Sequence, residues 1–258
     1  MIISNELSKI LEKYTLEKDS IGQSPAEVYK LIGNNENLYL KYSKEIYKPT
    51  TYCVCREANI IKWLNGKINL PKIAYNENKN GNSSAIMTEL KGKILENCGL
   101  PPNEYVKYLV KGLLEIQSID ITECPFVSTV DFRLNELKYL MKNNLTDNDC
   151  NNWEESTEFD SPDELYKWLC QNKPNNEELV FSHGDFCGSN LLLNGNNLEF
   201  IDFGRAGIAD KWYDIAFCVN EIKGMFNDEK YVNMFFELLD IKPDWEKINY
   251  YILLDELF

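Results

Sequence analysis

The stretch His183-Gly184-Asp185-Phe186-Cys187-Gly188-Ser189-Asn190, followed later by Ile201-Asp202-Phe203-Gly204, decides the fold. Phosphoryl transfer needs metal ions that bridge phosphate groups, and an acceptor for the proton of the attacking hydroxyl. Mg²⁺ takes oxygen ligands and keeps several waters, so one carboxylate and one amide oxygen can hold it. We therefore expect Asn190 and Asp202 to be metal ligands and Asp185 to be the catalytic base. Alternatively, each residue only turns or caps the backbone, as Asp and Asn often do in loops, but the ordered set favours the catalytic interpretation.

The other half of such a site is expected in the first third of the chain. Lys41 lies in the middle of an apolar strand-like run, where a solvated lysine is unexpected, and Glu57 follows on a predicted helix. In kinases a glutamate of this kind holds the lysine toward the nucleotide phosphates. Without the Asp-Phe-Gly segment, a lysine on an edge strand and a surface glutamate would be the better interpretation.

The candidate phosphate-covering loop, residues 20–25, is weakly marked. It carries one glycine and matches neither of the glycine-rich patterns that cradle phosphates. Its backbone N–H groups and the hydroxyl of Ser24 could still contact a phosphate.

The apolar pattern changes near residue 90. Before it, we expect a helix at 5–14, a hairpin from strands 27–32 and 37–42, a helix at 51–64, and strands at 72–75 and 84–87 around a turn-rich segment, 76–83. After it, we expect helices at 103–118, 132–144, 161–171, 209–223, 228–239 and 243–257, and short strands at 180–182, 191–193 and 198–201. Pro162 and Pro243 are expected at helix starts. The sequence therefore predicts an α+β fold with a sheet-plus-helix lobe at 1–90, a hinge at 88–92 and a larger, mainly helical lobe at 91–258.

The charge balance constrains the partners. Lys and Arg number 27 against 41 Asp and Glu, a net charge of −14. An excess of this size argues against binding nucleic acid through its phosphates, and it suits a cationic small molecule, since a negative field steers cations inward. Charge alone favours the simpler interpretation of an acidic surface that keeps the protein soluble.

The N-terminus has neither the basic nor the apolar segment of a signal peptide, and no apolar run approaches the roughly 20 residues of a membrane span. The eight cysteines are scattered. Cys53 and Cys55, two apart in a predicted helix, face different sides and cannot share a metal. We therefore expect reduced thiols, a cytoplasmic location and no membrane partner.

These motifs resemble the aminoglycoside phosphotransferases, and within them the 3′-phosphotransferases, or kanamycin kinases. The resemblance runs through Ser182-His183-Gly184-Asp185 to Asn190, and then through Asp202-Phe203-Gly204-Arg205-Ala206-Gly207-Ile208-Ala209-Asp210-Lys211-Trp212-Tyr213-Asp214-Ile215-Ala216. It continues at Tyr39-Leu40-Lys41, Arg56-Glu57, Asn152-Trp153-Glu154-Glu155 and the C-terminal run 241–258. It implies a two-lobed protein-kinase-like fold and ATP-dependent phosphorylation, with Mg²⁺, of an aminoglycoside hydroxyl. We expect a monomer or weak dimer. GTP is a possible alternative to ATP.

The resemblance also assigns roles to individual residues. Asp185 becomes the base, Asn190 and Asp202 the Mg²⁺ ligands, and Lys41 the phosphate-binding lysine held by Glu57. It implies that the nucleotide is contacted by Tyr39, which stacks on adenine, by backbone from Thr88 to Leu90 and by Ser24. It implies that the antibiotic is bound by Glu154, Arg205, Glu256 and the terminal carboxylate of Phe258.

The chain departs from the family pattern at acidic positions. Phe186-Cys187-Gly188 stands where the 3′-enzymes usually have a Gly-Asp pair, and Gly224-Met225 replaces an acidic pair, so the antibiotic pocket is expected to carry fewer negative groups. Two other functions stay open. One is a related kinase for a choline-like, sugar or macrolide hydroxyl, against which the Glu256-Leu257-Phe258 ending argues. The other is a nucleotide-binding module without turnover, which would need one of the core residues to be replaced.

Overall fold

The computed structural model describes residues 1–19, 24–34, 36–146, 153 and 158–258. The chain divides into two compact units. Unit 1 comprises Met1–Cys98 and Ser189–Arg205, and unit 2 comprises Gly99–Gly188 and Ala206–Phe258. This division groups residues 91–98 and 189–205 with the N-terminal sheet, whereas the sequence assigned them to the larger lobe. The lobes at 1–90 and 91–258 with a hinge at 88–92 stay a prediction.

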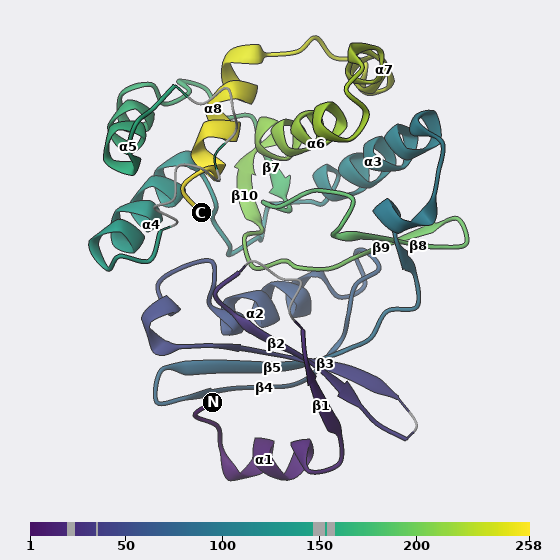
Figure 1. The fold of residues 1–258 in the computed structure, drawn as a ribbon, viewed down its shortest axis with the longest axis vertical. Helices are drawn as coiled ribbons and strands as arrows, with labels where there is room; N and C mark the ends of the chain where they lie inside the picture. The colour runs from purple at the N-terminus through teal and green to yellow at the C-terminus, as the bar shows by residue number, and fades with distance from the viewer. Residues whose placement is uncertain (20–23, 35, 147–152, 154–157) are drawn as a thin grey trace. The chain divides into compact units, whose positions relative to one another are not determined.

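Unit 1 is built on a five-stranded antiparallel sheet with the strand order β1-β2-β3-β5-β4 (Figure 1). Its strands are β1 (Thr15–Lys18), β2 (Glu27–Ile32), β3 (Asn37–Ser43), β4 (Ile73–Lys79) and β5 (Asn82–Thr88). The predicted β2–β3 hairpin is confirmed, with Ile32 opposite Asn37. The sequence did not predict β1, because all four of its residues are exposed and so give no alternation of apolar and polar positions.

The turn predicted at residues 76–83 was wrong in extent. Strands β4 and β5 pair up to Lys79 and Asn82, so only Asn80 and Gly81 form the turn. Both have positive φ, 51° and 81°, which is the geometry of a two-residue type I′ hairpin turn. Polar side chains made the segment resemble a loop, but backbone pairing does not depend on side-chain polarity.

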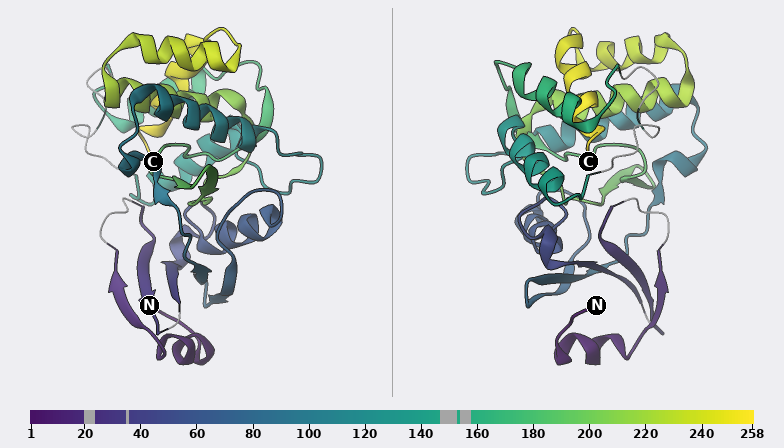
Figure 2. Two further views of the ribbon diagram at one scale, coloured as in Figure 1. Left: turned by 90° about the vertical axis from the view of Figure 1, so that its right-hand side faces the viewer. Right: turned by 60° about the vertical axis from the view of Figure 1, so that its left-hand side comes forward.

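Two helices cover opposite faces of this sheet (Figure 1). Helix α1 (Asn5–Leu11) buries Leu7 and Leu11 against Leu31, Leu40 and the neighbouring apolar residues of the sheet. Helix α2 (Val54–Leu64) lies on the other face, buries Val54, Ala58 and Ile61, and makes contact with β3, β4 and β5. Because successive residues of a strand point to opposite faces, Leu40 points toward α1 and Lys41 toward α2. The twist of the sheet can be followed in the rotated views of Figure 2.

A second, three-stranded sheet belongs to unit 1. It has the order β6-β8-β9, formed by β6 (Lys93–Ile94), β8 (Leu191–Asn194) and β9 (Asn197–Phe200). The β8–β9 hairpin was predicted from the sequence. The Phe200 N–H donates to the Asn69 carbonyl at 2.9 Å, and the Gly92 N–H to the Glu199 carboxylate at 2.9 Å. These long-range bonds join the hairpin to the N-terminal part of the chain.

Unit 2 is mainly helical. Its helices are α3 (Pro102–Gln117), α4 (Val130–Lys142), α5 (Pro162–Gln171), α6 (Lys211–Phe226), α7 (Glu229–Leu239) and α8 (Trp245–Asp255). Helix α6 buries eight of its residues, and α8 lies against it. The α+β class and the predicted helices are confirmed, with bounds shifted by up to three residues.

Two of the shifted helix starts have a clear structural reason. Residues predicted to begin a helix at 209 instead form β10 (Gly207–Asp210), which pairs with β7 (Leu179–Ser182). Helix α6 then starts at Lys211, with the Asp210 carboxylate accepting from the Trp212 N–H. Helix α8 starts at Trp245 with Asp244 as its N-cap, so Pro243 lies before the helix and not in its first turn. Within the described residues, no helix is long and apolar enough to cross a membrane.

Candidate active site

The site in unit 1 is centred on the ammonium group of Lys41. Its Nζ lies 2.8 Å from Glu57 Oε1 and 3.1 Å from Asp202 Oδ1. The side chains of Lys41 and Glu57 are only 14% and 5% exposed, whereas Asp202 is 46% exposed. The contact expected between Lys41 and Glu57 is therefore present, and β3 is a central strand rather than an edge strand. The first turn of α2 supplies Glu57, because that helix packs across the face on which Lys41 lies.

Burial and neighbouring charge compete at this cluster. Burial lowers the pKa of Lys41, but Asp202 and Glu57 together outweigh it and raise that pKa above its ordinary value, so the lysine is charged. Burial raises the pKa of Glu57, Asp202 raises it further, and Lys41 opposes both. Glu57 also receives a hydrogen bond from the Phe203 N–H, next to Asp202 in the chain. The cluster therefore presents a fixed cation beside a partly exposed carboxylate.

The backbone around Asp202 is held in an uncommon conformation. Asp202 has φ +63°, in the left-handed region that few residues other than glycine adopt. The Arg56 guanidinium donates to the Gly204 carbonyl at 2.7 Å. A Cβ at Gly204 would lie 3.0 Å from the Thr51 carbonyl oxygen, so the chain approaches closely here. Contacts on the segment after Asp202 thus sustain the strained turn.

Asn190 is brought next to this segment by the β8–β9 hairpin. Leu191 pairs with Phe200, and the Ile201 N–H donates to the Asn190 carbonyl at 3.1 Å. Asn190 is 9% exposed. Within the described ranges no group of three or more His, Cys, Asp or Glu could hold a metal. One carboxylate and one amide oxygen would suit Mg²⁺, which takes oxygen ligands and keeps several waters.

The loop that carries Asp185 belongs to unit 2. The Asp214 carboxylate, on the first turn of α6, accepts from the His183 N–H and the Gly184 N–H, both at 2.8 Å. Gly184 has φ +77°, which suits glycine. Asp214 is fully buried, and burial raises its pKa while His183 and the two N–H groups oppose the rise. Helix α6 thus holds the two residues that precede the half-buried Asp185, and in this way positions Asp185. Sequence reasoning missed this role of Asp214, because the two segments lie far apart in the chain.

The residues predicted to contact nucleotide all lie in unit 1. Tyr39, on β3, has its ring centroid 5.8 Å from Lys30 Nζ. Thr88 ends β5, and both its N–H and its hydroxyl are bonded to the Lys72 backbone, at 3.0 and 2.9 Å. Of the predicted stretch 88–90, the Thr88 amide is therefore already used within the sheet. Leu90 is half-buried, and the exposed Ser24 accepts from the Ala26 N–H.

The predicted antibiotic-binding residues are spread along the chain. Arg205, in unit 1, has its guanidinium 6.0 Å from the centre of the Tyr52 ring. In unit 2, the Phe258 ring lies 3.6 Å from the guanidinium carbon of Arg133, which is fully buried and paired with Glu136 at 2.7 Å. Glu154 lies outside the described residues, as does most of the candidate phosphate loop.

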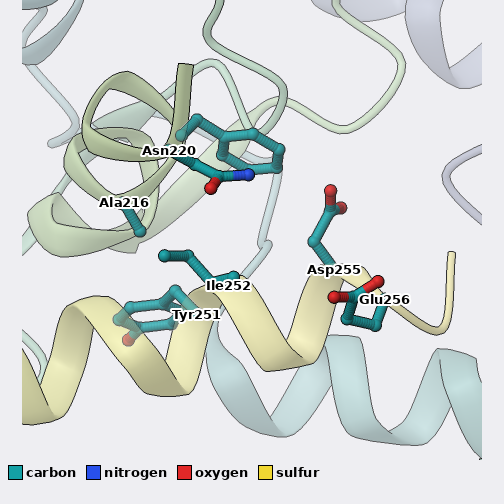
Figure 3. Close-up of a pocket in the computed structure, with 7 residues that line it drawn as sticks. Ala216, Asn220, Tyr251, Ile252, Asp255 and Glu256 are labelled. Atoms are coloured by element: carbon teal, nitrogen blue, oxygen red, sulfur yellow. The ribbon is translucent and has the colours of Figure 1, made fainter. Parts of the chain in front are cut away.

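Glu256 lines a pocket of about 140 Å³ in unit 2 (Figure 3). The pocket lies between α6, which contributes Asn220, and the end of α8, which contributes Asp255 and Glu256. Figure 3 shows Asn220 facing the α8 residues across this space. Sequence reasoning missed Asp255 and Asn220, although the position of Asp255 next to Glu256 was an available signal.

Comparison with known proteins gives the family. Residues 15–251 match the phosphotransferase enzyme family. The chain therefore belongs to the phosphotransferase enzyme family. It is 50% identical to an aminoglycoside 3′-phosphotransferase of Enterococcus faecalis, over 100% of this chain and 99% of that one. It is 47% identical to one of Campylobacter jejuni, over 94% and 96%. The predicted family resemblance is confirmed.

Solved structures support the same fold. An aminoglycoside 3′-phosphotransferase of type VIII superposes with a TM-score of 0.80 at 22% identity, covering 98% of this chain and 97% of that one. An aminoglycoside phosphotransferase of Streptomyces rimosus, solved with ADP and streptomycin, gives 0.77 at 16% identity, covering 98% of each. The predicted kinase-like α+β fold is confirmed.

Proposed function

We propose that this chain transfers the γ-phosphoryl group of ATP to the 3′-hydroxyl of an aminoglycoside, and so confers resistance to that antibiotic. The observation that carries the proposal is the full-length, 50% identity to an enzyme of that name. In the reaction, the substrate oxygen forms a bond to the γ-phosphorus, the bond from that phosphorus to the β-γ bridging oxygen breaks, and ADP leaves. The hydroxyl proton passes to Asp185.

The unit 1 cluster suits the nucleotide half of this reaction. We assign Lys41 to the phosphates, with Glu57 keeping its ammonium charged and in place. Asp202 and Asn190 would hold Mg²⁺, which would neutralise charge on the phosphates when bound. Tyr39, the backbone at 88–90 and Ser24 are assigned to the rest of the nucleotide. ATP is the nucleotide we propose, in the cytoplasm, where it is supplied.

The pocket in unit 2 suits a cationic substrate. Aminoglycosides are polycations, and carboxylates in a partly dry site attract ammonium groups more strongly than carboxylates in water do. At about 140 Å³ it is smaller than the roughly 300–1,000 Å³ of a typical ligand pocket, so it fits part of one sugar ring rather than a whole antibiotic. We assign Glu256 to one ammonium group of the substrate, with Arg205, Phe258 and Glu154 as further contacts.

A coupled assay of ADP release tests the proposal. Kanamycin A is expected to support turnover, whereas choline and erythromycin are expected to give none. Tobramycin, which has no 3′-hydroxyl, is the matched control for the position and should not be phosphorylated. Turnover with tobramycin equal to that with kanamycin would exclude the 3′ position. Turnover with choline or erythromycin but not with kanamycin A would show that the substrate is not an aminoglycoside.

A further inference from the structure

In addition to Asp214, a second carboxylate on a helix holds the loop that carries Asp185. Three residues after Asp185, the Gly188 N–H donates to Glu221 Oε1 at 2.9 Å. The Tyr105 hydroxyl donates to the same oxygen, at 2.5 Å. All these residues belong to unit 2, with Tyr105 on α3 and Glu221 on α6.

The contact requires glycine at position 188. A Cβ there would lie 1.8 Å from the Tyr105 hydroxyl oxygen and 2.7 Å from Glu221 Oε1, so any side chain would displace one of them. Tyr105 is 3% exposed, and its ring packs edge-on against Phe226 with centroids 5.6 Å apart, so it has little room to move. The glycine, the tyrosine and the glutamate therefore depend on one another.

Helix α6 therefore accepts hydrogen bonds from the loop on both sides of Asp185. Glu221 comes seven positions after Asp214, which is close to two helical turns, so both carboxylates lie on one face of α6. Asp214 accepts from His183 and Gly184 before the base, and Glu221 accepts from Gly188 after it. A loop fixed at only one end could still rotate Asp185, whereas a loop fixed at both ends holds it in one orientation.

We propose that Glu221, together with Tyr105, is a positioning residue that fixes the orientation of Asp185 and so raises the rate of phosphoryl transfer. The proposal rests on the proposed function. Direct binding of a substrate ammonium group is the weaker interpretation, because Oε1 already accepts two hydrogen bonds and Oε2 is shielded from solvent. A misplacement of about 1 Å can cost about 10²-fold in rate, which sets the scale of the expected effect.

Steady-state kinetics with kanamycin A and Mg·ATP test this on three variants and a control. Glu221→Ala is expected to lower kcat by about 10- to 100-fold, with both KM values within about threefold of the wild type. Glu221→Gln keeps an oxygen that can accept from the Gly188 N–H, so it is expected to restore most of kcat. Tyr105→Phe, which removes one donor but not the Gly188 bond, is expected to lie between them. Glu237→Ala removes the same charge from an exposed site on α7 and is expected to change nothing.

Hydrogen exchange resolved at single amides gives a readout that does not depend on the substrate. In Glu221→Ala the Gly188 amide is expected to exchange faster, while the Gly184 amide, held by Asp214, is expected to be unchanged. If Glu221→Ala does not fold, Tyr105→Phe carries the kinetic comparison, with kcat expected below that of the wild type and both KM values expected to stay near the wild-type values. Unchanged Gly188 exchange or an unchanged kcat would overturn the proposal. A glutamine variant as slow as the alanine one, with a raised KM for kanamycin, would also overturn it and make Glu221 a substrate ligand. If the wild-type enzyme phosphorylates no aminoglycoside, the proposed function fails. The exchange rate of the Gly188 amide then still decides whether Glu221 holds the loop at Gly188.

Discussion

Replacing Lys41 with methionine is expected to destabilise the fold as well as to abolish activity. The substitution leaves Glu57, which is 5% exposed, without its cation. Removing one partner of a buried ion pair costs about 3–5 kcal/mol, because the other charge stays buried without compensation. Asp202 is 46% exposed, so solvent screens its share, which we place at about 0–1 kcal/mol. We therefore expect Lys41→Met to lower the free energy of unfolding by about 3–5 kcal/mol near pH 8.

The size of this loss should depend on pH. Burial and Asp202 raise the pKa of Glu57, and Lys41 is the group that lowers it, so the pKa rises further in the variant. A carboxyl whose pKa is raised by folding contributes stability that is present below its unfolded pKa and is lost as the pH rises through its folded pKa. Lys41→Met should therefore be less destabilised at pH 5 than at pH 8, by at most about 1.4 kcal/mol per pH unit between the two pKa values.

Urea unfolding at both pH values measures this, with Lys41→Met/Glu57→Gln as the control. Glutamine removes the uncompensated charge but keeps an oxygen for the Phe203 N–H. The double variant should therefore regain about 2 kcal/mol or more over Lys41→Met at pH 8 and lose the pH dependence. A loss below about 1 kcal/mol in Lys41→Met, or equal losses in the single and double variants, would refute the reasoning.

Three further predictions concern other parts of the molecule. Asp185→Ala should lower kcat by about 10²–10⁴-fold with the KM for ATP nearly unchanged, and an equal loss of ATP affinity in the coupled assay would contradict its assignment as base. Asp202→Ala should abolish the preference for Mg·ATP over ATP alone in calorimetry, since it removes the only carboxylate assigned to the metal; undiminished Mg·ATP affinity would place that ligand elsewhere. Arg133→Met should cost about 3–5 kcal/mol in urea unfolding, because it leaves Glu136 buried without its cation, and Arg133→Met/Glu136→Gln should recover much of this. Equal midpoints for the single and double variants would contradict it.

Local patterns in the sequence predicted most of the secondary structure. Alternation identified β2 and β3, and helical spacing identified α2 and the six helices found in the described part of unit 2, because in these segments one face is buried and the other is not. The segments that were missed lack such a contrast. All of β1 is exposed, and β10 is a short, mostly buried strand that runs directly into α6. Its pairing with β7 is a tertiary contact that the local pattern does not encode.

The candidate site likewise contains contacts that the sequence predicted and contacts that it did not. The pairing of Lys41 with Glu57 was predictable, because a lysine inside a buried strand needs a counter-charge and the next helix supplied one. The Asp214 and Glu221 contacts with the loop that carries Asp185 were not predictable, since each joins segments about 30 residues apart through backbone N–H groups, which carry no sequence signal. The placement of β8 and β9 in unit 1 likewise depends on bonds to Asn69 and Gly92 that only the folded chain shows.

The geometry of Glu221 also bears on how the antibiotic would be attracted. Position 188 has no room for an acidic side chain, because a Cβ there would meet Tyr105 and Glu221. Glu221 Oε1 already accepts two hydrogen bonds, so Glu221 does not offer this oxygen to a cation either. Attraction of a cationic antibiotic would then depend more on Asp255 and Glu256, at the C-terminal end of α8. The negative end of the helix dipole lies there, so two acidic side chains are unfavourable unless a cation is near. The stacking of Phe258 on buried Arg133 holds the chain just beyond those acids in place. A pocket that relies on few carboxylates in a fixed position would select its substrate by where the ammonium groups lie, more than by how many there are.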